Sequence, residues 1–507
     1  MLKRSRAIHV VLHSAPVVLA LLAALQNCAP AYRPGLPPSS PFPANDALAD
    51  GALAEGIATG DVTDRSALVW FRTVGPSEAR VEWVPEGVLA PDGSWNFSAG
   101  SAARTVVTTT QEHDFTATVP LSGLTPATRY QYRVVTSSAN VETDSLMTAR
   151  EVTTGRFVTA SLHDSSEPVT FLWGGDIGGQ QRCRVERSGS AIFDQMLHKR
   201  PAFAVLLGDL IYGDDRCPSP PNVPGGDFLA STLDQFRAKH RYQRGDPALQ
   251  RFLAAVPVYA TWDDHEVRNN FSGPHEPLMP VGRRALLEYW PIGTPPEDPH
   301  RLYRNIRRGA DLELFILDTR QYRSRNAEPD GDHKTMLGAA QRDWLLDALA
   351  RSGATWKVIA TTVPLSNPKM GTKLVPGNDS WARGADGTGF QTELSMIVNA
   401  IRDRRIRNVV WLAADVHYAQ LNVYDPDGDG VADFHEFICG PLSAAPVQPV
   451  PPDPVFRPTT LYSEGGFSNF GVVTVSGASL RVEVVDEAGT SRFTRTFRGY
   501  GSASQKE

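Results

Sequence analysis

Four apolar, strand-like runs of this 507-residue chain are each followed closely by an aspartate. They are Asp176 after residues 169–173, Asp209 after 202–207, Asp264 after 256–261 and Asp415 after 409–412. Functional side chains in α/β sheets converge just past the carboxyl ends of strands, although a single aspartate there is often only the N-cap of the next helix. Four carboxylates at one edge would repel one another unless cations neutralise them. The spacing therefore predicts a metal cluster at these aspartates.

His265 directly follows one of these aspartates and stands near Trp262. A histidine in such a place is either a satisfied core residue or a proton donor beside the metal cluster. The adjacent carboxylates favour the second interpretation. No serine or threonine occupies a nucleophile motif, so we expect direct attack by a metal-bound hydroxide and no covalent intermediate.

A second cation signal lies in the stretch DPDGDGVADFHE at residues 425–436, which fits the template of a calcium-binding loop. The template assigns as ligands Asp425, Asp427, Asp429, Val431, Asp433 and Glu436. The flanks, residues 420–424 and 434–438, have the pattern of two strands of a hairpin and not of helices, and Asp-Gly repeats also form ordinary turns. We predict a structural calcium ion here, with Glu436 the least well placed ligand.

The elements that must position the metal cluster begin near residue 157, where apolar runs start to alternate with amphipathic segments. The predicted strands are 169–173, 202–207, 256–261, 312–317, 356–361 and 409–412, and the predicted helices are 190–199, 341–351 and 392–402. This alternation favours a layered α/β core. Two further strand-like runs, 471–475 and 480–485, are expected to extend a sheet.

Residues 51–152 have an all-β pattern. Short runs rich in β-branched and aromatic residues include 66–72 and 79–83, and a turn then leads into a strand that carries Tyr130 and Tyr132. A turn followed by a Tyr-x-Tyr strand is typical of the tyrosine corner of fibronectin-type sandwiches. We predict a β-sandwich domain over this range, without catalytic residues of its own.

The N-terminal residues 1–28 have the pattern of an export signal: a basic start, then the apolar run 17–25, which is too short and too interrupted for a membrane span. Residues 29–50 form a proline-rich linker. Cys28 could carry a lipid anchor, but Gln26 and Asn27 fit a lipidation box poorly, so we favour simple cleavage. The mature protein is thus expected in the periplasm or outside the cell, without a transmembrane segment.

Export places the cysteines in an oxidising compartment. Cys183 and Cys217 each follow a strand that carries a candidate ligand, so we predict a disulfide between them. Cys439 lies in an apolar run and is expected to be buried. The net charge of −6 gives no electrostatic footprint for nucleic acid.

Four motifs resemble those of PhoD-type alkaline phosphatases, which belong to the calcineurin-like metallophosphoesterases. They are GDLIY at 208–212, WDDHEVRNN at 262–270, DTRQYR at 318–323 and DVH at 415–417. The front part is also similar to that family's N-terminal sandwich, at residues 59–61 and 68–72. The resemblance covers nearly the whole mature chain, and the WDDHE run is its most specific element. It implies a β-sandwich at 51–152 followed by a catalytic domain at 153–500, in which two sheets are flanked by helices.

The resemblance also implies roles for single residues. Asp209 would bridge the metals, Tyr212 would ligate one through its phenolate, and Asp415 and His417 would complete the metal shells, with Asp264 as a further ligand. His265 would act beside the leaving group, and Asn269 or Asn270 would bind a phosphate oxygen. Asp176 stands where the family has a cysteine that binds iron. This exchange favours hard cations, so we expect two or more ions, Ca²⁺ together with Fe³⁺ or Mn²⁺.

The resulting hypothesis is an exported metal-dependent hydrolase of phosphate monoesters, diesters or both. Arg320 and Arg323 would neutralise the transferring phosphoryl group, unless they form a structural salt bridge, for example with Asp318. Two alternatives remain at this point. One is a phosphodiesterase or phospholipase that acts on lipid or teichoic-type polymers, and the other is a non-catalytic exported binding protein with structural metals.

Overall fold

The computed structural model describes residues 53–88, 96–97, 102–136, 151–369 and 376–500. All of these belong to one compact unit that spans residues 47–507. The predicted export signal, the proline-rich linker and Cys28 lie outside the described residues. Among the described residues, no helix combines the length and the apolar character that crossing a membrane requires.

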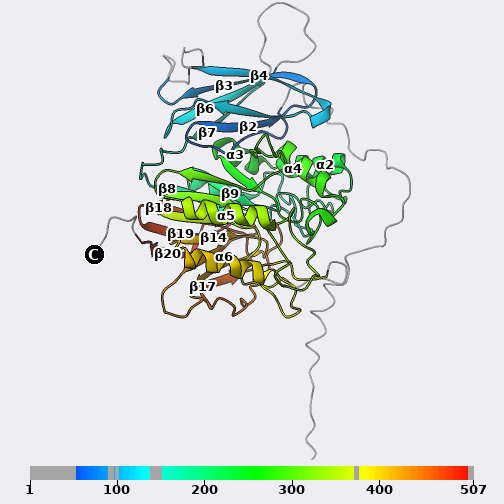
Figure 1. The fold of residues 1–507 in the computed structure, drawn as a ribbon. Coiled ribbons are helices and arrows are strands. Elements are labelled where there is room, and N and C mark those ends of the chain that lie inside the picture. The colour runs from blue at the N-terminus through cyan, green and yellow to red at the C-terminus, as the bar shows by residue number, and fades with distance from the viewer. Residues whose placement is uncertain (1–52, 89–95, 98–101, 137–150, 370–375, 501–507) are drawn as a thin grey trace, which may run out of the picture. The chain divides into compact units, whose positions relative to one another are not determined.

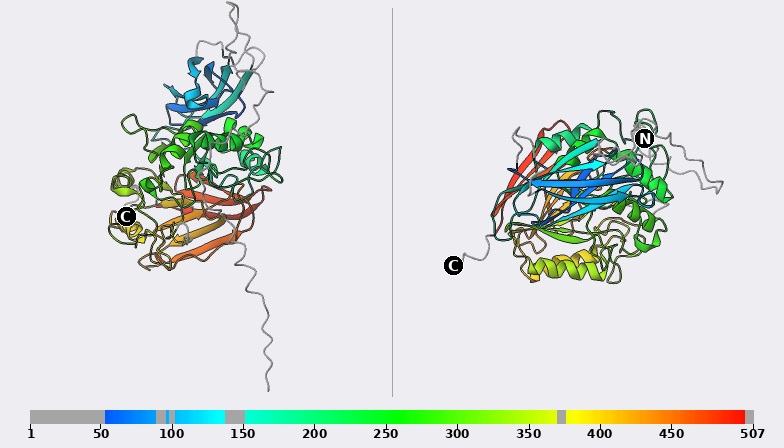
Figure 2. Two further views of the ribbon diagram at one scale, coloured as in Figure 1. Left: turned by 90° about the vertical axis from the view of Figure 1, so that its right-hand side faces the viewer. Right: turned by 90° about the horizontal axis from the view of Figure 1, so that it is seen from above.

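The first large sheet has nine strands in the order β20-β19-β18-β8-β9-β10-β1-β2-β5. Their bounds are β1 Ile57–Gly60, β2 Ser66–Arg72, β5 Thr116–Ser122, β8 Val169–Gly174, β9 Phe203–Leu207, β10 Val258–Thr261, β18 Asn469–Ser476, β19 Ser479–Asp486 and β20 Ser491–Arg498. Strands β8, β9 and β10 are parallel neighbours, so their carboxyl ends lie at one edge. The C-terminal strands β18 to β20, orange to red, continue this sheet beyond β8 (Figure 2).

The second large sheet has seven strands in the order β11-β12-β13-β14-β16-β15-β17. Their bounds are β11 Arg304–Arg308, β12 Leu312–Ile316, β13 Trp356–Ala360, β14 Val409–Ala413, β15 Tyr418–Tyr424, β16 Phe434–Ile438 and β17 Pro458–Gly465. Strands β12, β13, β14 and β16 run parallel. Almost every side chain of β12 to β14 is buried, as expected for strands that are covered on both faces.

The two large sheets pack against each other through a shared apolar core, in which Phe171 and Val205 of the first sheet meet Leu314 and Leu412 of the second. Helices cover the outer faces: α1 Ala191–His198, α3 Pro247–Ala255 and α4 Met279–Tyr289 pack on the first sheet. Helices α5 Gly338–Arg351 and α6 Gln391–Asp403 pack on the second (Figure 1). The predicted layered α/β fold, with two sheets flanked by helices, is confirmed.

The front part of the chain forms a sandwich. A four-stranded sheet, in the order β4-β3-β6-β7, faces strands β1, β2 and β5 across an apolar core. Its strands are β3 Ser77–Pro85, β4 Ala103–Thr109, β6 Arg129–Thr136 and β7 Glu151–Val158. The hydroxyl oxygen of Tyr130 accepts a hydrogen bond from the Thr125 amide at 2.9 Å, which is the predicted tyrosine corner. Because β1 also pairs with β10, the sandwich and the first large sheet share strands.

Three helices and two short 3-10 turns were not expected from the sequence. The helices are α2 Leu233–Arg244, α3 and α4, and the turns are η1 Gln111–His113 and η2 Gly273–His275. Helix α2 begins with a capping box at Thr232 and Gln235. It buries several charged side chains, among them Arg237, which donates to Glu288 of α4 at 2.7 Å and 2.8 Å. A helix whose buried face is charged gives no apolar periodicity in the sequence.

Candidate metal centre

The four candidate aspartates gather at the carboxyl ends of β8, β9, β10 and β14, as the strand order requires. Three overlapping sets of residues could each hold a metal ion, and within each set the ligand atoms lie within 4.8 Å of one another. The sets are Asp176, Asp209 and His417; Asp209, Asp264 and His265; and Asp209, Asp263, Asp264 and Asp415. Asp209 belongs to every set. The backbones of Asp176, Asp209, Asp415 and His417 have positive φ angles between 50° and 68°. Such conformations strain a non-glycine residue and concentrate at functional sites.

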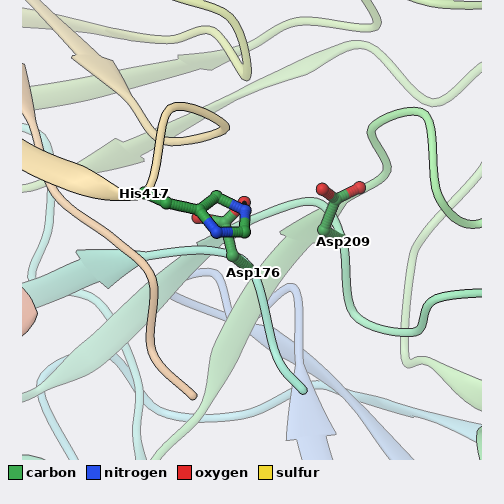
Figure 3. Close-up of side chains that lie close together, drawn as sticks. All are labelled: Asp176, Asp209 and His417. Atoms are coloured by element: carbon green, nitrogen blue, oxygen red, sulfur yellow. Dashed lines mark ion pairs between the residues drawn. The ribbon is translucent and has the colours of Figure 1, made fainter. Parts of the chain in front are cut away.

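The first half of the cluster consists of Asp176, Asp209, Tyr212 and His417 (Figure 3 shows three of these side chains). The Nε2 atom of His417 lies 3.0 Å from the Tyr212 hydroxyl and 3.4 Å from Asp176 Oδ1. Its Nδ1 donates to the Ala445 carbonyl oxygen at 2.6 Å. This backbone contact fixes the tautomer, so Nε2 keeps a lone pair for a metal ion.

Two glycines make room for this half of the cluster. A Cβ atom on Gly179 would lie 2.3 Å from the ring of Tyr212, so only glycine lets the loop after β8 pass against the phenol. Gly440 has a φ angle of +147°, and a Cβ atom there would lie 2.4 Å from Asp176 Oδ2. The backbone therefore approaches both candidate ligands more closely than any side chain would allow.

The second half consists of Asp263, Asp264 and Asp415, with Asp209 shared between the halves. Several oxygens here and in the first half are buried without a hydrogen-bond partner among the described residues: Asp176 Oδ2, Asp263 Oδ2, Asp264 Oδ1, Asp415 Oδ2 and Asn270 Oδ1. A buried carboxylate oxygen without a partner costs on the order of a few kcal/mol. Oxygens of this kind, pointing into one cluster, are a donor set that hard cations would satisfy.

The electrostatics of the cluster agree with this assignment. Burial and the neighbouring carboxylates raise the pKa of Asp209 well above its usual range. Burial likewise raises the pKa of Asp415 and that of the Tyr212 phenol. Burial alone would also raise the pKa of Asp264, but the Lys369 and Arg320 cations hold it well below its usual range. So many acidic groups in one buried place are stable as anions only with additional positive charge, and the residues therefore fit bound metal ions.

Glu266 organises the two loops that carry these aspartates. Its carboxylate accepts hydrogen bonds from the amides of Leu210 at 2.7 Å, Asp263 at 2.9 Å and Asp209 at 3.2 Å. Burial raises the pKa of Glu266 to about 8. This residue belongs to the WDDHE run, but its role as the connector between the ends of β9 and β10 was not expected from the sequence.

His265 is buried beside the cluster, where Asp214 holds its ring. Nδ1 of His265 lies 2.6 Å from Asp214 Oδ1, and Asp214 Oδ2 accepts from the Asn269 amide at 2.6 Å. Although burial opposes it, the Asp214 and Asp264 carboxylates raise the pKa of His265 to about 10. Because Asp214 occupies Nδ1, Nε2 is the ring nitrogen that remains for another partner. The role of Asp214 was not expected from the sequence, although this residue follows the GDLIY motif by two positions.

The two asparagines after His265 differ in their positions. Asn270 is buried and donates its amide to Asp264 Oδ2 at 2.6 Å, while its side-chain oxygen has no hydrogen-bond partner among the described residues. Asn269 is half-buried, and its amide connects to Asp214. Both therefore lie beside the cluster, and their contact with a phosphate oxygen stays a prediction.

Comparisons with known proteins agree with this geometry. Residues 178–482 match the family model of the PhoD-like phosphatase, and residues 39–161 match that of the PhoD-like phosphatase N-terminal domain. The first match covers more than half of the 507 residues. This chain belongs to the PhoD-like phosphatase family.

Two relatives of this chain are informative. Alkaline phosphatase D of Bacillus subtilis (strain 168) is 33% identical over 211 residues, a segment that covers 37% of this chain and 35% of the relative. The chain thus matches about a third of the length of that curated protein. A solved structure of PhoD superposes with a TM-score of 0.70 at 20% identity, over 90% of this chain and 91% of that one.

The fold is shared more widely. The purple acid phosphatase PPD1 from yellow lupin seeds superposes with a TM-score of 0.60 at 12% identity, over 87% of this chain and 73% of that one. This likeness shows that the chain shares its fold with that phosphatase. The predicted resemblance is confirmed, and membership of the family supports the expectation of a phosphoric ester hydrolase.

Arg320 and Arg323 of the PhoD-like chain are fully buried. The Arg320 guanidinium donates to both carboxylate oxygens of Asp379 at 2.8 Å and to Asp263 Oδ1 at 2.6 Å. Arg323 donates to Asp379 Oδ1 at 2.6 Å. This geometry favours the structural salt bridge over a contact with the phosphoryl group. The partners are Asp379 and Asp263, whereas Asp318 accepts from the backbone amide of Arg320 and not from its guanidinium.

The predicted calcium loop connects β15 and β16 as a hairpin, and three of its carboxylates, those of Asp425, Asp427 and Asp433, lie close together. Arg402 already pairs with Asp427 and Asp433. Asp425 accepts from the amides of Gly428, Asp429 and Gly430, as in an ordinary turn. Asp429 and Val431 are exposed. A calcium ion here stays a prediction.

Glu436 corrects the expected ligand set of that loop. It lies within β16, is fully buried and accepts hydrogen bonds from the Leu365 amide, Asn422 and the Tyr424 hydroxyl. The strand begins at Phe434, and β pairing turns Glu436 into the core and away from the loop. The template fails at its last position because a helix, which would place that residue beside the ion, is absent from this hairpin.

Cys183 and Cys217 form the predicted disulfide, and Cys439 is buried as a free cysteine. The bond joins the loops after β8 and β9, which also carry Asp176 and Tyr212. We expect the double variant Cys183→Ser/Cys217→Ser to lose about 3–4 kcal/mol of unfolding free energy, because the unfolded chain is no longer constrained over a 34-residue separation. Urea denaturation measures this loss. An unchanged midpoint would show that the bond does not stabilise the fold, and Cys439→Ser is the matched control.

Proposed function

We propose that this chain is a metal-dependent phosphoric ester hydrolase that acts on phosphate monoesters, diesters or both. The observation that supports this most strongly is one arrangement: buried carboxylates with unpartnered oxygens next to a histidine that a carboxylate holds in place. Structural metals alone need no adjacent proton donor. A non-catalytic binding protein is therefore the weaker interpretation.

Each residue has a task in this proposal. Asp176, Asp209, Tyr212, Asp264, Asp415 and His417 would hold two or more ions, with Asp209 shared between them. When bound, such ions lower the pKa of a coordinated water and clamp phosphate oxygens in line for attack. His265 Nε2 donates its proton to the leaving-group oxygen as the P–O bond breaks, while Asp214 keeps the ring oriented at Nδ1. Asn270 would orient a phosphate oxygen from the side of Asp264.

The choice of metals follows from the donor set. Asp176 at the first strand end supplies an oxygen where a thiolate would favour a softer ion. We propose Ca²⁺ together with Fe³⁺ or Mn²⁺, because the remaining donors are mostly carboxylates and Tyr212 suits a ferric ion. The disulfide supports the proposal that the enzyme works in an oxidising compartment, in the periplasm or outside the cell.

Hydrolysis of a chromogenic phosphate monoester by the purified protein tests the proposal. We expect turnover that disappears after chelation and returns when Ca²⁺ and Fe³⁺ or Mn²⁺ are added. Parallel assays with a chromogenic bis-ester and with a phospholipid decide between a monoesterase and an enzyme for diesters. Full turnover in excess chelator after exhaustive dialysis would contradict the metal requirement.

The leaving-group dependence of Asp214→Asn tests the role of His265. Without the Asp214 carboxylate the ring loses its orientation and much of its positive charge, so proton donation weakens. We expect kcat to fall on the order of 10²-fold for an alkyl phosphate, whose leaving group needs a proton, and far less for a nitrophenyl ester. Equal losses for both substrates would show that Asp214 only supports the fold.

A further inference from the structure

The carboxylate cluster is electrostatically uneven. In the part of the chain that the structure describes, no lysine or arginine nitrogen lies within 4.0 Å of Asp176 or Asp209, and Asp176 pairs only with His417. On the other half, Lys369 Nζ donates to Asp415 Oδ1 and lies 3.9 Å from Asp264 Oδ2. Arg320 Nη2 lies 3.7 Å from Asp264 Oδ1. The second half therefore already contains positive charge, whereas the first contains none from lysine or arginine.

Lys369 is held in this position by its backbone. Its amide donates to Asn378 Oδ1 at 2.8 Å, and its carbonyl oxygen accepts from the Asp379 amide at 3.1 Å. Asp379 is in turn fixed by Arg320 and Arg323 in the core. The Lys369 side chain is 26% exposed, yet its ammonium group lies among the buried carboxylates and not in solvent. The lysine is thus a fixed part of the cluster.

We propose that Lys369 is the built-in counter-cation of the second metal position, between Asp209, Asp264 and Asp415. An ion entering that position competes with the ammonium group for Asp415 and Asp264, whereas an ion between Asp176, Asp209 and His417 meets no such competitor. The second ion is therefore held more weakly, and its occupancy follows the free concentration of the cation. This inference rests on the proposed function, because both require metal ions in this cluster.

Calorimetric titration of the metal-free protein with Ca²⁺ or Mn²⁺, combined with elemental analysis after gel filtration, tests the inference without an activity assay. We expect the wild type to retain one tightly bound ion and to bind a second one reversibly. In Lys369→Gln the second ion should bind at least tenfold more tightly, because a unit positive charge that contacts Asp415 and lies 3.9 Å from Asp264 is removed. The metal-free variant should also melt at a lower temperature than the metal-free wild type. Added Ca²⁺ should raise the melting temperature of the variant by more than that of the wild type.

Lys199→Gln is the matched control. Lys199 is 27% exposed and pairs with Glu483 at 2.8 Å, away from the cluster, so its removal should leave both metal affinities unchanged.

Unchanged or weaker binding of the second ion in Lys369→Gln would overturn the inference. If that variant also lost inhibition by inorganic phosphate, Lys369 would be a phosphate contact instead. Two equally tight ions in the wild type would overturn the inference and leave the proposed function standing, whereas no bound ion at all would contradict both.

Discussion

Asp209→Asn is expected to lower kcat for a phosphate monoester on the order of 10³-fold, which corresponds to about 4 kcal/mol of transition-state stabilisation. Asp209 is the residue common to all three ligand sets around the strand ends, so its charge would serve both proposed metal positions. An amide keeps the shape of the side chain but cannot bridge two cations as a carboxylate does. Steady-state kinetics and elemental analysis of the variant measure the two consequences together, lost turnover and lost metal.

The fold should survive this change. The burial of Asp209 among other carboxylates raises its pKa, so removing its negative charge relieves repulsion in the metal-free protein. We expect the metal-free variant to unfold at the same temperature as the metal-free wild type or at a higher one. Asp234→Asn, at an exposed position of helix α2, is the matched control, because its side chain is 88% exposed. Full turnover in Asp209→Asn would rule out the bridging role.

Arg320→Ala is expected to destabilise the fold by about 3–5 kcal/mol, because it leaves the buried carboxylates of Asp379 and Asp263 without their main cation. Urea denaturation of the metal-free protein measures the change. The surface pair Arg251–Asp194 is the control, since its side chains are 50% and 38% exposed and Arg251→Ala should cost less than about 1 kcal/mol. Lost turnover at unchanged stability would instead place Arg320 in contact with the phosphoryl group.

The sequence predicts the position of the cluster well, for a physical reason. Strands that are buried on both faces appear as continuous apolar runs, and parallel strands bring the residues that follow them to one edge. The run 202–207 therefore predicted the bounds of β9 to within one residue, and it placed Asp209 just past the end of that strand. The predicted strand 409–412 placed Asp415 and His417 in the same way, although β14 lies in the other sheet.

The partners of the cluster could not be predicted, because tertiary contacts supply them. Lys369 and Asp379 lie in a stretch with neither helical nor strand periodicity, and their closeness to Asp415 and Arg320 arises only in the folded chain. Asp214 had a weak signal in its position after GDLIY, but its bond to His265 connects two separate strand ends. Helix α2 was missed for a related reason, since its buried face is charged and paired with other elements.

In the predicted calcium loop the local sequence pattern was misleading at one position. It predicted a ligand that the surrounding structure places elsewhere. The spacing of Asp425, Asp427 and Asp433 does bring their carboxylates together. The final ligand of the template, however, depends on a helix, and the chain continues there as strand β16, so Glu436 turns into the core. Spacing predicts a local cluster, but the element that follows decides which residue closes it.

Anomalous diffraction from crystals grown with Mn²⁺ and Ca²⁺ tests the central claim most directly. We expect a strong peak between Asp176, Asp209, Tyr212 and His417, and a weaker one between Asp209, Asp264 and Asp415 whose height rises with the cation concentration. A map without any peak at these strand ends, from crystals of protein that hydrolyses phosphate esters, would contradict it.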